Sequence, residues 1–346
     1  MLARLGRASK ALQESDEPQI VMEGLSKEFL EIHALTDVNL TIRRGDGLML
    51  VNRESMGKAR GGGGLGIYDV SNPSNPREIS HWLCDGSGVH RFTFDGRFAY
   101  ISPEVEGYLG NIVMILDLER PERPKEVGRW WMPGQWTAGG ETPSWERRQH
   151  RCHHPIRHGN RLYVSYWHGG IVVLDIEDMA SPKLVSRFGW SPPYPWPTHS
   201  AVPVPFSIFG RQWMLCADED VDRQLPDLAP EMSAFLRIVD VTDEINPVSI
   251  SSFQVGRLHG RRHPMMTGCH QPVEIVRGTQ IPVAWFAQGV RIIDIADPLS
   301  PKEAAFFIPD PAAPNARVSS NDVFEDDRGL IYLIDRVGGL SILERT

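Results

Sequence analysis

The chain has 346 residues, of which 41% are hydrophobic and 23% are charged, a balance that supplies a large core and argues against disorder. Its net charge of -8 argues against a nucleic-acid partner, which usually meets a basic surface. The start of the chain lacks the apolar core of a signal peptide, and no window nears the roughly 18 apolar residues of a membrane span. We therefore expect a soluble, cytoplasmic protein whose four cysteines are free thiols.

A repeated pattern organises the sequence from residue 65 onward. Five apolar runs end in an aspartate, which a turn rich in Ser, Asn and Pro follows. The aspartates are Asp69, Asp117, Asp175, Asp240 and Asp294, and a proline stands seven residues after each, at Pro76, Pro124, Pro182, Pro247 and Pro301. The pattern predicts a strand, a turn in which the aspartate bonds the backbone, and a second strand.

Two further strands are predicted upstream of each run, as in HRFTFDGRFAYIS and HPIRHGNRLYVSYW. Each repeat is then a four-stranded antiparallel unit of roughly 50 residues, the size of a β-propeller blade. We expect one all-β domain over residues 1–346, a six-bladed β-propeller. Its blades would span roughly 36–83, 88–131, 151–190, 197–254, 268–308 and 319–346.

The sixth repeat ends before its fourth strand, near Glu344. The N-terminal sequence EPQIVMEGL matches the fourth-strand sequence NPREISHWL, with Pro18 in the proline position. Residues 18–24 are therefore predicted to complete the last blade and to leave no open edge between the first and last blades.

These repeats resemble the LVIVD-repeat family of β-propellers over nearly the whole chain. The resemblance implies a fold far more than an activity, so the site needs its own argument.

Histidines recur where each predicted blade begins. The second residue of the first strand is, in chain order, Asn39, His90, His153, His199, His270 and Asn321. The first strand of a blade is innermost, so four imidazoles would face one point on the axis. A structural alternative is a shared ancestral histidine that only bonds neighbouring blades.

The metal interpretation favours a transition ion at His90, His153, His199 and His270. Imidazole suits Fe, Cu, Zn or Ni, whereas no carboxylate occupies these positions as Ca²⁺ or Mg²⁺ would require. We expect Fe(II), with Cu and Zn as alternatives. Asn39 and Asn321 would leave an open side for water, dioxygen or substrate.

This constellation is similar to the axial four-histidine iron site of carotenoid cleavage oxygenases, which have seven blades and different motifs. More distantly it resembles selenium-binding proteins, a likeness that implies copper and thiol oxidation as an alternative. Cys152 and Cys269 directly precede two of the histidines. Strand alternation predicts that these thiols, and His154, point away from the metal.

Long loops are predicted on the side of the histidines, and their tryptophans, including Trp136 and Trp145, would form an apolar canopy. From this side we predict His168 and Glu141 as catalytic acid or base residues. The function expected is a non-haem iron oxygenase or oxidoreductase acting on a small or medium, apolar or aromatic substrate, with dioxygen as co-substrate. A non-redox lyase, hydratase or hydrolase and a propeller scaffold remain alternatives.

Overall fold

The computed structural model describes residues 3–4, 6–7, 40–42, 47–55, 62–72, 74–145, 149–191, 193–220, 233–256, 267–314 and 316–345. The chain divides into two compact units. The first comprises Gln13–Arg187, and the second comprises Met1–Leu12 with Phe188–Thr346.

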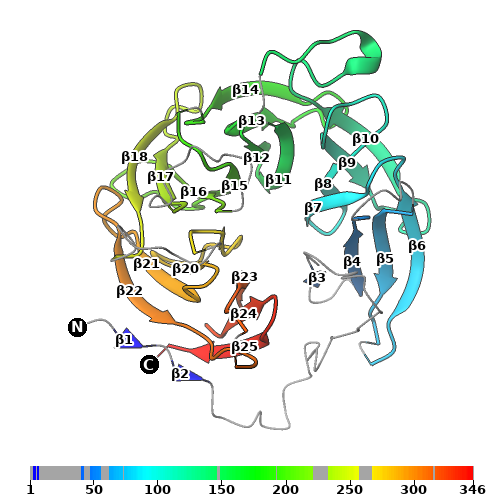
Figure 1. Ribbon diagram of the computed structural model, residues 1–346. Helices are drawn as coiled ribbons and strands as arrows, with labels where there is room; N and C mark the ends of the chain where they lie inside the picture. Colours follow the sequence, from blue (N-terminus) through cyan, green and yellow to red (C-terminus); the bar gives the residue numbers. More distant parts are fainter. Residues whose placement is uncertain are drawn as a thin grey trace. The chain divides into compact units, whose positions relative to one another are not determined.

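The Gln13–Arg187 unit contains three sets of four antiparallel strands in which neighbours in sequence are neighbours in space (Figure 1). Their strands are β3 (Leu40–Ile42), β4 (Leu48–Arg53), β5 (Gly64–Asp69) and β6 (Arg77–Leu83); β7 (Val89–Phe94), β8 (Phe98–Pro103), β9 (Val113–Asp117) and β10 (Lys125–Trp130); and β11 (His150–His158), β12 (Arg161–Trp167), β13 (Ile171–Asp175) and β14 (Lys183–Phe188). One 3₁₀ turn, η1 (Thr137–Gly139), follows β10.

The second unit has the same strand order in three further sets of strands. Their strands are β15 (Thr198–Pro203), β16 (Trp213–Asp218), β17 (Leu236–Asp240) and β18 (Val248–Phe253); β19 (Gln271–Pro272), β20 (Gln280–Ala284), β21 (Val290–Asp294) and β22 (Lys302–Phe307); and β23 (Ser320–Glu325), β24 (Ile331–Asp335) and β25 (Gly339–Glu344). The all-β prediction is confirmed, and these four-stranded meanders are typical of a propeller-like fold.

Short N-terminal strands extend two of these sheets. β1 (Ala3–Arg4) lies parallel to β22, and β2 (Gly6–Arg7) pairs antiparallel with β25. The predicted closing strand, residues 18–24, lies outside the described residues. Among the described residues, the strand beside β25 thus comes from further upstream than the sequence match indicated.

The repeat aspartates close the turn after the third strand of their sheets. Each accepts a hydrogen bond at Oδ1 from the backbone N–H two residues later, at 2.8–2.9 Å. These are Asx turns, in which a short side chain replaces a backbone acceptor. The turn chemistry predicted from the sequence is confirmed.

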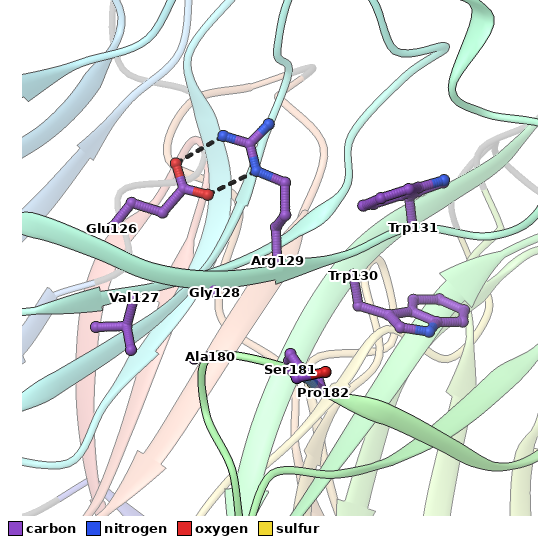
Figure 2. Close-up of a pocket in the computed structure, with 9 residues that line it drawn as sticks. All are labelled: Glu126, Val127, Gly128, Arg129, Trp130, Trp131, Ala180, Ser181 and Pro182. Carbon is purple, nitrogen blue, oxygen red and sulfur yellow. Dashed lines mark hydrogen bonds and ion pairs between the residues drawn. The ribbon is translucent and has the colours of Figure 1, made fainter. Parts of the chain in front are cut away.

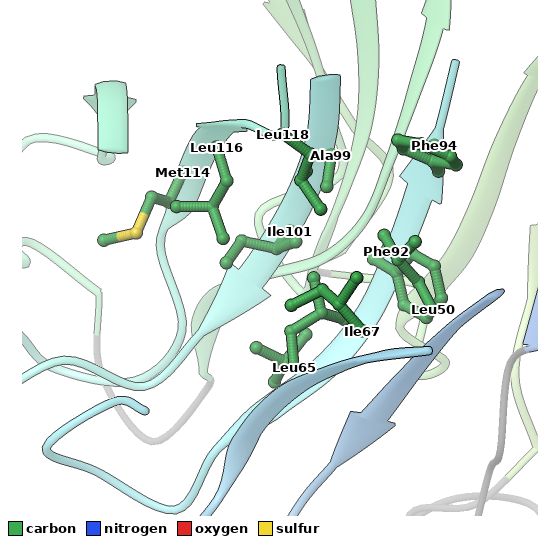
Figure 3. Close-up of a cluster of buried hydrophobic side chains, with 11 residues drawn as sticks. Leu50, Leu65, Ile67, Phe92, Phe94, Ala99, Ile101, Met114, Leu116 and Leu118 are labelled. Carbon is green, nitrogen blue, oxygen red and sulfur yellow. The ribbon is translucent and has the colours of Figure 1, made fainter. Parts of the chain in front are cut away.

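Alternation along β8 and β9 buries both faces of the β7–β10 sheet. On β8 and β9, Ala99, Ile101, Met114 and Leu116 pack with Leu50, Leu65 and Ile67 of the preceding sheet, as Figure 3 shows. The intervening Tyr100, Val113 and Ile115 pack instead with Leu162, Val164 and Leu174 of the following sheet. Successive strand residues point to opposite faces, so one strand serves two cores.

Candidate metal centre

Three of the predicted histidines lie where the pairing of their first strand is irregular. The register shifts between Val89 and Phe92 in β7, between His150 and His154 in β11, and between Thr198 and Ser200 in β15. Bulges of this kind re-aim a side chain and are common beside functional sites. The strand alternation assumed from the sequence is therefore interrupted at the histidines themselves.

In the Gln13–Arg187 unit, His90 and His153 meet at their Nε2 atoms, which lie 2.9 Å apart. The Nδ1 atom of His90 lies 2.7 Å from the carboxylate of Glu54, at the end of β4. An ionised carboxylate only accepts, so His90 donates from Nδ1, and its Nε2 lone pair accepts the hydrogen bond from Nε2 of His153, a contact that a bound ion would replace. Metal-binding histidines are commonly oriented by such a carboxylate partner.

The spacing of these nitrogens suits a shared ion. Two nitrogens on adjacent octahedral positions, each about 2.1 Å from a metal, lie about 3.0 Å apart. Burial lowers the pKa of His153 well below its ordinary value, and the nearby His90 lowers it further. His153 is therefore neutral near pH 7, the state that a metal ligand needs.

In the second unit, His199 and His270 lie with ring centres 3.8 Å apart. The carboxylate of Glu219, directly after β16, lies 3.3 Å from Nε2 of His270 and 4.0 Å from Nε2 of His199. All three side chains are buried. Two imidazoles and one carboxylate are a donor set used by non-haem Fe(II) oxygenases and by catalytic zinc sites.

Hydrogen bonds at Nδ1 of His199 and His270 leave the Nε2 atom of each ring facing the carboxylate of Glu219. His270 donates from Nδ1 to the backbone oxygen of Asn321. Ser200 uses its hydroxyl proton toward Gln271 at 3.1 Å, so its oxygen accepts from Nδ1 of His199 at 3.0 Å. Three of the four histidines thus have a fixed tautomer with Nε2 as the available ligand atom.

Neither glutamate was predicted as a metal ligand from the sequence, although a register signal marks both positions. In five repeats the aspartate pairs with a residue of the second strand, and the position six residues later lies at the end of that strand or within two residues after it. This position is occupied by Glu54, Glu104, Trp167, Glu219 and Phe286. These residues form a second set of equivalent repeat positions, in addition to the histidine positions of the first strands.

The predicted catalytic residues lie in different surroundings. His168 is buried, and its ring centre is 6.2 Å from that of Trp167, whose ring stacks on His153. Glu141 instead organises its own loop, because its carboxylate accepts from the backbone of Gly134 at 2.7 Å and of Trp136 at 3.1 Å. These hydrogen bonds lower the pKa of Glu141. A catalytic role for either residue stays a prediction.

Several loop aromatics predicted to form a canopy pack on side chains outside the histidine sets. Trp145 stacks on His150 at 4.5 Å, and Trp190 lies against the guanidinium of Arg237 at 4.3 Å. Trp136 is 41% exposed and neighbours Trp131. Asn39, predicted at the open side of the histidine set, lies outside the described residues.

The histidines and the cysteine of the stretch RCHHPIRHGN, residues 151–160, lie in different environments. His153 contacts His90, Cys152 and His154 are buried, and His158 is exposed in the turn that ends β11. Burial raises the pKa of the Cys152 thiol well above its ordinary value, and Cys269 behaves alike. These two thiols are structural core groups in the described residues.

A surface hollow of about 520 Å³ lies along β10 and the turn at 180–182 (Figure 2). Glu126 and Arg129 pair at its edge through two contacts of 2.6 Å, and Trp130 and Trp131 line it. The predicted metal ligands are absent from its lining, so this hollow belongs to a different part of the unit.

Comparisons with known proteins support the fold and leave the activity open. The LVIVD repeat model matches residues 59–83 and 158–189, which supports a β-propeller-like repeat family. No curated protein matches the chain. Among the described residues, no helix is long and apolar enough to cross a bilayer.

Two solved structures are similar in fold. The Pseudomonas aeruginosa periplasmic gluconolactonase matches with a TM-score of 0.56 and 13% identity, over 86% of this chain and 82% of that one. A chain from an S. cerevisiae assembly of Dbp5 with Nup159, Gle1, IP6 and ADP matches with a TM-score of 0.52 and 12% identity, over 89% and 75%. At such identities the likeness is one of fold.

Proposed function

We propose that this chain is a metal-dependent enzyme, a six-bladed β-propeller whose histidine and glutamate sets bind a transition metal. The observation that carries the proposal is the orientation of the imidazoles. His90, His199 and His270 each engage Nδ1 with an oxygen acceptor and aim Nε2 at a second ligand group. A histidine kept only for hydrogen bonding between strands has no need of this shared tautomer.

Fe(II) is the ion we favour. His199, His270 and Glu219 supply two imidazoles and one carboxylate, the donor set with open positions that non-haem Fe(II) oxygenases use. When bound, such an ion activates dioxygen beside the substrate. The protein's own residues would hold neutral imidazoles in place and exclude bulk water, since the three side chains are buried. The substrate class proposed is small or medium, apolar or aromatic.

A non-redox hydrolase or lyase is the second candidate, because the same two-histidine, one-glutamate set holds catalytic Zn²⁺. The identity of the ion separates the two candidates. Iron in the purified protein and oxygen consumption with phenolic or isoprenoid compounds would support the oxygenase. Zinc without oxygen consumption would favour the second candidate.

The experiment is metal analysis of protein purified without a histidine tag. We expect roughly one equivalent of transition metal in the wild type and a large loss in His153→Ala and His199→Ala. His158→Ala is the matched control, because this histidine is exposed in the same strand as His153. Metal below roughly a tenth of an equivalent in the wild type after iron or zinc loading would end the proposal.

The two single variants also test the sequence prediction of one shared ion. If all four histidines bind one ion, His153→Ala and His199→Ala should each lose nearly all of the bound metal. Loss of about half in each variant would mean that the His90 and His199 sets bind separately.

A further inference from the structure

Two aromatic residues occupy the same repeat position and each contacts one predicted ligand. Each stands six residues after the second-strand residue that pairs with a repeat aspartate. Trp167 is the last residue of β12, and Phe286 follows shortly after β20. The ring centre of Trp167 lies 5.0 Å from that of His153, with 26° between the planes. The ring centre of Phe286 lies 4.4 Å from that of His270, at 41°.

The backbone at both positions adopts the left-handed conformation, with φ of 51° at Trp167 and 39° at Phe286. Large side chains rarely adopt it, and such residues persist where the surroundings hold them. The same turn surrounds both: Tyr166 N–H donates to Gly170 O, and Trp285 N–H donates to Gly289 O, each at 2.7 Å. Strained residues of this kind cluster at functional sites.

A cation lies near each ring. The guanidinium carbon of Arg151 is 4.4 Å from the Trp167 ring centre, and that of Arg336 is 5.5 Å from the Phe286 ring centre. Cation–π attraction adds to the forces that fix the two rings. Two separate repeats thus present one imidazole, one aromatic ring and one arginine together.

We infer that Trp167 and Phe286 are positioning residues that set the ring planes of His153 and His270 for metal binding. The inference rests on the proposed metal function. A hydrogen bond to Glu54 fixes His90, whereas a flat ring fixes the plane of His153 by stacking. A hydrogen bond to Asn321 fixes the tautomer of His270, and Phe286 adds a restraint on its tilt.

The test compares Trp167→Leu and Phe286→Leu with Trp167→Phe, which keeps a ring. Phe209→Leu is the control, because Phe209 also has a left-handed backbone, with φ of 54°, but is 71% exposed. Co(II) is the probe ion, and its dissociation constant and visible spectrum are measured for each folded variant. Should Trp167→Leu fail to fold, Trp167→Gly replaces it, because glycine accepts the left-handed backbone.

We expect the two leucine variants to bind Co(II) about 10-fold or more weakly with an altered spectrum, as loss of an orienting partner typically does. The Co(II) dissociation constant of Trp167→Phe should stay within about threefold of the wild-type value, and that of Phe209→Leu should equal it. Unchanged affinity and spectrum in both leucine variants would overturn the inference.

A crystal structure of the metal-free Trp167→Leu protein separates this inference from the proposed function. We expect the Nε2 atoms of His90 and His153 to move apart from their 2.9 Å spacing. If these atoms move apart but the wild-type protein binds no metal, Trp167 still positions the His153 ring and the proposed metal site is rejected. An unchanged His153 ring would reject the positioning role whatever the metal result.

Discussion

The carboxylate of Glu54 lies 2.7 Å from Nδ1 of His90, and this one contact decides which imidazole nitrogen can bind an ion. The two residues come from neighbouring sheets, at the end of β4 and within β7. Their side chains are 19% and 14% exposed, so the pair is sheltered but reachable. At the proposed metal site, Glu54 would therefore act through His90.

Replacing Glu54 tests this relation. Glu54→Ala should weaken metal binding by about 10- to 100-fold, because His90 loses the acceptor that fixes its tautomer. Glu54→Gln should lose less, since its amide oxygen still accepts from Nδ1. Titration with Co(II) or Zn²⁺ measures the change. The control is Glu119→Gln, an exposed carboxylate paired with Arg97, and an equal loss there would contradict the assignment.

The sequence predicted the turns well because their cause is local. Asp69 and its equivalents bond a backbone N–H only two residues away, so a short pattern contains the whole interaction. The repeat also predicted His90 and His199 as the second residues of β7 and β15, where they lie, whereas β11 begins three residues before His153. The glutamate partners of His90 and His199 were not predicted as ligands, because only the first strands were aligned, and Glu54 and Glu219 directly follow the second strands β4 and β16.

Strand alternation was a weaker guide at the histidines. The alternation of side chains between the two faces holds only where strand pairing is regular. The pairing of β7, β11 and β15 is irregular beside His90, His153 and His199. A bulge adds a residue whose side chain the alternation cannot assign. The ring contacts of Trp167 likewise depend on a left-handed backbone that no composition rule predicts for tryptophan.

The cysteines should be unreactive in the folded protein. All four are buried, and burial raises the pKa of Cys152, Cys216 and Cys269 well above the ordinary value of a thiol. Iodoacetamide attacks the thiolate, so labelling at pH 8 should be slow in native protein and fast in denaturant. Mass spectrometry counts the labels. Rapid native labelling of Cys152 would instead favour thiol chemistry beside His153.

Acid should destabilise the fold through the turn aspartates. Hydrogen bonds from Ser71 and Arg77 lower the pKa of Asp69 from 3.8 to about 2, and Arg97 lowers that of Asp117. The folded state binds these protons more weakly than the unfolded chain. The stabilisation is therefore complete above about pH 4 and is lost as the pH falls toward about 2.

Urea unfolding between pH 6 and pH 2 measures this loss. Asp69→Asn keeps the oxygen that closes the turn but does not titrate, so its free energy of unfolding should depend less on pH over this range. Glu122→Gln, at an exposed surface position, is the control. An Asp69→Asn curve parallel to that of the wild type would contradict a role for this carboxylate in acid sensitivity.

The ion pair of Arg237 with Asp218 should contribute far more to stability than the surface pairs. Asp218 is fully buried and lies 3.0 Å from Nε of Arg237, while Trp190 donates to it at 2.7 Å. Arg237→Met leaves a buried carboxylate without its charge partner, which typically costs about 3–5 kcal/mol. Arg97→Met breaks the exposed pair with Asp117 and should cost about 1 kcal/mol or less. Chemical unfolding at neutral pH compares the two variants. A loss in Arg237→Met no larger than that in Arg97→Met would contradict the prediction and would mean that Asp218, whose pKa burial already raises to about 7, takes up a proton once Arg237 is removed.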